Sequence, residues 1–192
     1  MTEQVVRGYW VSAGIAFVGM HYPTETSQRV LGSLSKELRL AAAQLGPAEW
    51  CPRSHHTELL RAIASVQKDE SRAFEDLLAY GQYVGSEAAN GSLKPFLLIS
   101  TLKLFARKLP GLWLRDHQDD GKLESDIAQL EEARLNVQLT GIRGYDHVGV
   151  ATLGWIKGTM AKFGRRGLHV KQSGWSLKHS APGEMSGELS WS

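Results

Sequence analysis

The sequence predicts an α+β fold, in which a helical N-terminal part is followed by an antiparallel ββαββ sheet with a crossing helix. Up to about residue 120, apolar side chains recur with helical spacing. From Lys122 onward, apolar and polar residues alternate strictly, as in a half-buried strand. A helical pattern then lies between two pairs of alternating segments. We therefore expect a single domain, 1–192, with a helical part at 1–120 and a sheet-plus-helix part at 121–192.

Composition supports one compact domain and excludes several classes of protein. Of the 192 residues, 42% are hydrophobic, which excludes disulfide scaffolds, collagen and disordered chains. The net charge of +2 is too small to predict attraction to nucleic acid or to an anionic membrane. The longest early apolar stretch, Trp10 to Met20, is about half of the ~20 residues that a membrane-spanning helix needs. The single cysteine, Cys51, predicts a reducing compartment, and we expect the cytoplasm.

The helical part divides at its turn-forming residues. Asp69 is placed to begin one helix and Asn90-Gly91 to end it, while Pro110-Gly111 is expected to break the next. The apolar residues between 92 and 108 occupy nearly every face, which predicts a central helix. The helices are expected at 10–20, at 24–45 with a break within 32–35, around 59–66, from 69 to 91, and from 92 to 108.

The second part is predicted to build the sheet. Segments 122–127 and 134–140 form an antiparallel hairpin, and 168–177 and 183–191 form two further strands, with a bulge near Gly174. Between them lies a helix whose Leu153, Ile156 and Met160 pack on the sheet. Gly154 and Gly158 are one turn apart, so another backbone is expected to approach closely there.

The common catalytic signatures are missing from the sequence, so we do not expect an enzyme. His55-His56 is expected at a helix start or on the surface, because neighbouring residues of a helix point about 100° apart. Residues 115–120 combine one histidine with three aspartates; a solvated connection is favoured there over a metal site. A metal-dependent enzyme built on His117, Asp119 and Asp120 is the third and least favoured alternative.

Spaced motifs along nearly the whole chain resemble those of a known family. These are Arg7-Gly8 before an apolar helix, Glu49-Trp50 with Pro52, Tyr80-Gly81, the run from Leu109 to Trp113, and the closing Glu188 to Trp191. The sequence resembles a myxobacterial paralogue family that is distantly similar to haem/nitric-oxide-binding (H-NOX) domains and to 4-vinyl-reductase-type ligand-binding domains. The resemblance implies an H-NOX-like fold and a binding or signalling role.

Haem is the alternative cofactor that the resemblance suggests. Haem-binding H-NOX domains use a proximal histidine late in the helix before the sheet, and His117 lies near that place. They also hold the propionates with a Tyr-x-Ser-x-Arg motif, and none of the five tyrosines here is followed by serine at the second position. We therefore expect a haem-less scaffold with no cofactor, and keep a haem-based gas sensor with His117 as axial ligand as the alternative.

The leading functional hypothesis is a non-enzymatic regulatory module that binds a small apolar ligand or a protein partner. Its site is expected where the two parts meet, because ligand sites favour such junctions. Trp113 and Trp155 would form apolar walls, and His117 and His147 would give polar contacts. Both tryptophans filling a packed core is an equally good interpretation. No nucleic-acid partner is expected, and the oligomeric state, a homodimer included, stays open.

Overall fold

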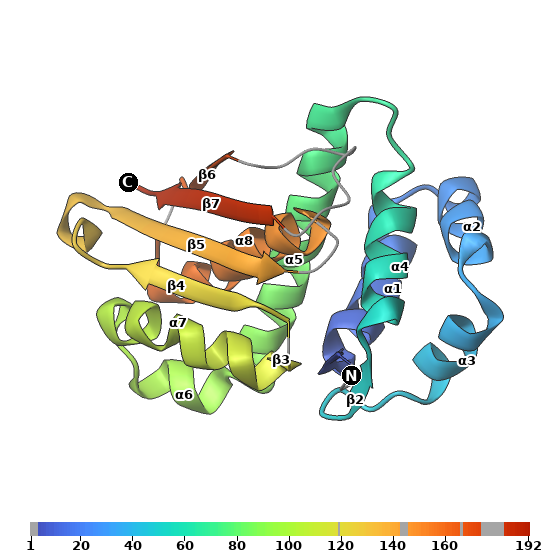
Figure 1. The fold of residues 1–192 in the computed structure, drawn as a ribbon, viewed down its shortest axis with the longest axis horizontal. Helices are drawn as coiled ribbons and strands as arrows, with labels where there is room; N and C mark the ends of the chain where they lie inside the picture. The colour runs from blue at the N-terminus through green and yellow to red at the C-terminus, as the bar shows by residue number, and fades with distance from the viewer. Residues whose placement is uncertain (1–3, 119, 143–145, 166, 174–182) are drawn as a thin grey trace.

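The computed structural model describes residues 4–118, 120–142, 146–165, 167–173 and 183–192, and all statements below concern these residues. Figure 1 shows a four-stranded sheet on one side, helices α1 to α4 on the other, and α5 and α8 between them. The helices are α1 (Gly8–His21), α2 (Thr24–Ser33), α3 (Lys36–Gln44), α4 (Arg53–Ala64), α5 (Glu70–Asn90), α6 (Lys94–Ile99), α7 (Leu102–Asp116) and α8 (Asp146–Met160). The α+β fold class is confirmed. None of these helices is both long and apolar enough to cross a membrane.

The main sheet has the order β4-β5-β7-β6 and is antiparallel throughout. Its strands are β4 (Lys122–Asp126), β5 (Arg134–Ile142), β6 (His169–Ser173) and β7 (Gly183–Ser190). The predicted hairpin is confirmed, since Leu123 pairs with Leu139 across β4 and β5. Leu135 and Leu189 are a buried pair across β5 and β7. The predicted bulge near Gly174 lies outside the described residues.

Helix α8 covers the inner face of the sheet, as the sequence predicts. Leu153, Ile156 and Met160 are fully buried, and Leu153 packs directly over Gly187 of β7. On its other side α8 crosses α5 at backbone contact distance (Figure 1). A Cβ atom at Gly154 would lie 2.2 Å from the Leu78 carbonyl oxygen, and one at Gly81 would lie 2.0 Å from that of Ala151. The predicted close approach at Gly154 and Gly158 is therefore confirmed, with α5 as the partner.

The predicted central helix at 92–108 is wrong. The chain leaves the helical conformation at Ser100, so that α6 and α7 are separate helices. Thr101 begins α7 by accepting a hydrogen bond from the Leu104 amide. Leu98 and Ile99 are exposed, which shows that apolar residues on every face do not require a buried helix. The central pair is instead α5 and α8.

The expected break at Pro110-Gly111 is also wrong, because α7 continues to Asp116 with Pro110 inside it. Proline has no amide hydrogen, so the carbonyl four residues earlier, at Ala106, loses its helical partner. The hydroxyl of Ser125 on β4 donates a 2.7 Å hydrogen bond to that carbonyl. The sheet thus replaces the bond that the proline removes, and the helix carries on to His117.

A second, three-stranded sheet was not predicted. Its order is β2-β1-β3, with β1 (Val5–Arg7) between β2 (Trp50–Pro52) and β3 (His117–Gln118). Its strands are only two or three residues long, which is too short for apolar and polar residues to show alternation in the sequence. Val6 pairs with both Cys51 and His117. This sheet therefore ties His117 to the start of α1.

Candidate functional site

His117 lies at the end of α7, where the helical part meets the sheet part. Its backbone amide donates to the Trp113 carbonyl as the helix ends, and it then enters β3 beside Val6. The side chain is only 1% exposed. A helix break was predicted before this residue, but α7 continues without one and places His117 in the interior.

Aromatic rings from three helices surround His117. The Trp113 ring, one turn earlier on α7, stacks on the imidazole with 3.8 Å between centroids and 11° between planes. Trp10 of α1 approaches the same imidazole edge-on at 5.1 Å, and it stacks on Trp155 of α8 at 6.2 Å. We call the six residues Trp10, His56, Tyr80, Trp113, His117 and Trp155 the aromatic cluster. The structure therefore brings together Trp113 and Trp155, as predicted, with Trp10 between them.

The aromatic cluster leaves almost no free space. The cavity between these rings measures about 10 Å³, whereas ligand sites in proteins have volumes of about 300–1,000 Å³. Trp10, Trp113 and Trp155 are each at most 4% exposed. This geometry favours the packed-core interpretation of the two predicted tryptophans; their role in ligand binding stays a prediction.

His56 takes part in the aromatic cluster through a chain of hydrogen bonds. The Tyr80 hydroxyl donates to the Trp10 carbonyl at 2.7 Å, and Nε2 of His56 lies 3.0 Å from the same hydroxyl oxygen. Because the single tyrosine proton is already used, His56 donates from Nε2. Burial, with a smaller effect from Arg53, lowers the pKa of His56 to about 3. His55 and His56 lie in the first turn of α4, so the expected helix start is confirmed, whereas a surface position is wrong for His56, which is fully buried.

His117 is likewise held neutral. Burial, and then the nearby His56 and Arg53, lower its pKa well below the usual value. The Trp113 carbonyl, which lies near the ring without hydrogen-bond geometry, opposes this shift only in part. Neither ring nitrogen has a hydrogen-bond partner among the described residues.

The solvated connection expected at residues 115–120 is wrong, because Asp116, His117 and Asp120 are buried. Asp120 forms an ion pair inside the fold. Oδ2 of Asp120 lies 2.6 Å from Nε of Arg53, and both side chains are buried. Burial raises the pKa of Asp120 to about 6, although Arg53 opposes the shift. No group of three or more potential metal ligands occurs in the described part of the chain. Asp119, from the metal-enzyme alternative, lies outside the described residues.

His147 is the third residue of the predicted ligand site, and its role there stays a prediction. It is buried at the start of α8, but it does not line the small cavity of the aromatic cluster. Burial and the charge of Arg61 on α4 lower its pKa to about 4. The structure thus places His147 near Arg61 of α4.

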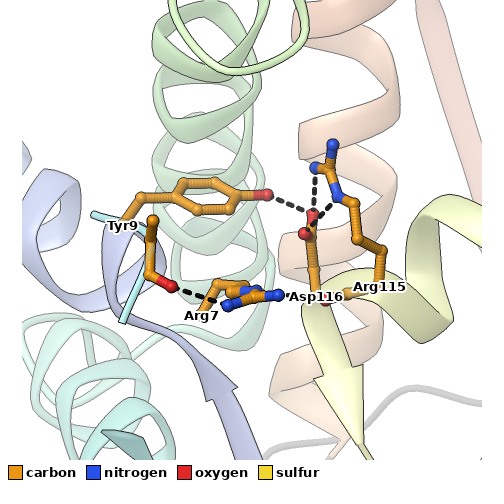
Figure 2. A network of polar contacts seen from close by, with 5 residues as sticks. Arg7, Tyr9, Arg115 and Asp116 are labelled. Carbon is orange, nitrogen blue, oxygen red and sulfur yellow. Dashed lines mark hydrogen bonds and ion pairs between the residues drawn. The ribbon is translucent and has the colours of Figure 1, made fainter. Parts of the chain in front are cut away.

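A polar network borders the aromatic cluster on its outer side (Figure 2). Arg115 binds the Asp116 carboxylate with two hydrogen bonds, of 2.8 Å from Nε and 2.9 Å from an Nη atom. The Tyr9 hydroxyl donates to the same carboxylate at 2.6 Å. Burial, and then Asp116, raise the pKa of Tyr9, so Tyr9 stays protonated as the donor. Arg115 and Asp116 were predicted only as part of a solvated connection. Their network with Tyr9 could not be predicted, because Tyr9 is far away along the chain.

Solved structures with the same arrangement are H-NOX proteins. The H-NOX protein from S. oneidensis, solved in an Fe(II)NO ligation state, matches with a TM-score of 0.65 and 10% identity over 97% of this chain and 99% of that one. The chain has an H-NOX-like fold. A mutant of the T. tengcongensis H-NOX matches with a TM-score of 0.59 and 13% identity over 96% of this chain and 97% of that one.

The sequence comparisons add nothing to this structural likeness. No protein-family model matches the chain, and no curated protein sequence does. The H-NOX-like fold that the family resemblance implied is therefore confirmed, and the resemblance to a myxobacterial paralogue family stays a prediction.

The residues around His117 do not fit a haem. Axial ligation would place the macrocycle against an imidazole nitrogen, but Trp113 covers one face of that ring, Trp10 packs against it, and the free volume is about 10 Å³. The propionate motif is also missing from the sequence. The interior of this H-NOX-like fold is occupied by its own side chains.

Proposed function

We propose that this chain is a haem-free, non-enzymatic regulatory module on an H-NOX-like scaffold. The observation that carries the proposal is the filled interior: three tryptophans leave only about 10 Å³ beside His117. A structural signal in such a module comes from a ligand or partner bound elsewhere on the scaffold. The close contact of α5 with α8 links the helical part to the sheet part and gives such a signal a path.

The test is the absorption spectrum of protein expressed with a haem precursor supplied. We expect no Soret band, because the tryptophans fill the space that a porphyrin needs. The S. oneidensis H-NOX, expressed in the same way, is the fold-matched control for haem loading. Stoichiometric haem in this protein, with a spectrum that changes in His117→Ala, would contradict the proposal.

One observation favours the alternative, a haem-based gas sensor. His117 is buried with both ring nitrogens lacking a hydrogen-bond partner among the described residues, and buried polar atoms normally have one. For haem to use this imidazole, Trp10 and Trp113 would both have to leave their positions. The same spectrum decides between the two functions.

A further inference from the structure

A cavity of about 580 Å³ opens on the outer side of the Arg115–Asp116 pair. Its volume lies within the range of about 300–1,000 Å³ that is typical of small-molecule sites. The lining comes from the first turns of α1, the turn before β2, the C-terminal end of α5, and the end of α7. We propose that this cavity binds a small monocarboxylate with an apolar body. The proposal goes beyond the haem-free function, because it assigns a place and a chemical class to the ligand.

The walls of the cavity suit an apolar body. The side chains of α1 that line the cavity are small and leave its space unfilled, and the Tyr83 ring of α5 provides a flat surface at one side. Most of the exposed lining is apolar, and the two arginines that line it are joined by a hydrogen bond from Nε of Arg7 to the Arg115 carbonyl (Figure 2). The lining residues that supply the apolar surface are Ala13, Ala16, Pro47, Ala48, Tyr83 and Ala88.

Arg7 supplies the charge for the ligand's head group. Its guanidinium lies 3.7 Å from the centroid of the Trp50 ring, which fixes the plane of the group. Its hydrogen bonds go to backbone carbonyls, from Nη1 to Ala48 at 2.6 Å and from Nε to Arg115 at 3.3 Å. A guanidinium has five N–H donors, so donors remain for a carboxylate.

The neighbouring charges limit the ligand to one negative charge. The charge of Arg115 is neutralised by Asp116, to which it donates two hydrogen bonds. The described partners of Arg7 are uncharged backbone carbonyls, so its positive charge is available to a ligand. Glu87 also lines the cavity, from an exposed position on α5. The second charge of a dianion such as a phosphate monoester would find no further unpaired cation in the described lining and would be repelled by Glu87.

The experiment compares octanoate with octanamide and octyl phosphate by isothermal titration calorimetry on the full chain. We expect octanoate to bind with a Kd below about 1 mM. Octanamide should bind at least about tenfold more weakly, since it lacks the charge that pairs with Arg7. Equal binding of octanamide, tighter binding of octyl phosphate, or no binding of octanoate up to about 1 mM would each overturn the proposal.

Two variants locate the site. Arg7→Gln removes the charge but keeps a donor for the Ala48 carbonyl, and Ala16→Leu fills the cavity from an exposed position on α1 without touching the arginine. Both should weaken octanoate binding at least about tenfold. Arg107→Gln, on an exposed part of α7 outside the cavity, is the matched control and should bind as the wild type does. Unchanged binding in Ala16→Leu would overturn the proposal even if Arg7→Gln unfolds.

The absorption spectrum tests the haem-free function and the octanoate titration tests the carboxylate site, so either proposal can be overturned without the other. A Soret band in protein that binds octanoate would contradict the haem-free function and leave the carboxylate site standing. A protein without haem that fails to bind octanoate would overturn the site alone.

Discussion

The neutral histidines in the interior lower the stability of the folded protein at acidic pH. His56 has a pKa of about 3 in the folded protein, against about 6.5 in an unfolded chain. Between these values the unfolded chain binds a proton that the folded chain does not, so stability falls as the pH falls below about 6.5. His117 and His147 act in the same direction. Asp120, whose pKa is raised to about 6, acts in the opposite direction.

We predict that His56→Gln makes stability less sensitive to acid. Glutamine keeps a donor for Tyr80 but cannot be protonated. At pH 5 the wild type should lose about 2 kcal/mol of unfolding free energy through His56, since each pKa unit corresponds to about 1.4 kcal/mol. Urea unfolding at pH 7 and pH 5 measures the difference, with the exposed His169→Gln as control. An equal loss in His56→Gln and the wild type would show that His56 is not held neutral.

At the scale of elements, local patterns predict the helices and strands where neighbours in sequence decide the structure. The break between α2 and α3, the start of α5 near Asp69 and the hairpin of β4 and β5 are confirmed for this reason. The continuation of α7 through Pro110 could not be predicted, because its partner, Ser125, comes from the sheet. The buried position of His56 likewise depends on Tyr80, 24 residues away.

The hydrogen bond from Ser125 to Ala106 is expected to matter only because Pro110 is present. Ser125→Ala leaves the buried Ala106 carbonyl without a partner and should cost about 1–3 kcal/mol. In the Pro110→Ala background the new amide can bond to that carbonyl, so the same change should cost less. A double-mutant cycle by urea unfolding measures this coupling. Additive effects would show that Ser125 does not compensate for the proline.

The crossing of α5 and α8 should be intolerant of any side chain. Gly81→Ala would place Cβ 2.0 Å from the Ala151 carbonyl oxygen, both helices being held by their own backbone. We expect the free energy of unfolding to fall by about 3 kcal/mol or more, which is the upper end of the range for overpacked cores. Gly111→Ala on α7 is the matched control, since nothing lies within 4 Å of its Cβ position. The control should gain about 0.5–1 kcal/mol from helix propensity, and a similar gain in Gly81→Ala would contradict the close crossing.

For the whole molecule, the site depends on elements that are distant in sequence. The sequence places Trp113, His117 and Trp155 near the junction of the two parts, but it does not show that Trp10 fills the space between them. It also misses the cavity at Arg7, whose walls come from four separate segments. Asp116 lines both that cavity and the aromatic cluster. A ligand that pairs with Arg7 would lie in the cavity that Asp116, the residue before His117, also lines.

The predicted division at residue 120 should not be a division in stability. Helix α5 belongs to the first part and α8 to the second, yet their backbones touch at Gly81 and Gly154. Neither part can bury its half of this contact alone, so we predict a single cooperative unfolding transition. Far-ultraviolet circular dichroism reports mainly the helices of residues 8–116, and tryptophan fluorescence reports both parts, since three of the six tryptophans lie in the aromatic cluster. The two signals should give coincident curves in urea.

Ile156→Asp tests this cooperativity from inside α8. The side chain is fully buried, and an unpaired buried carboxylate costs several kcal/mol, a large fraction of the about 5–15 kcal/mol that stabilises a domain. We expect the variant to lose the helical signal of residues 8–116 together with the sheet, although the substitution lies in the second part. Lys157→Gln, at the half-buried neighbouring position, should keep both. A variant that retained most of the wild-type helical signal while its sheet was lost would show that the helical part folds alone, because nearly all the helices lie before residue 120.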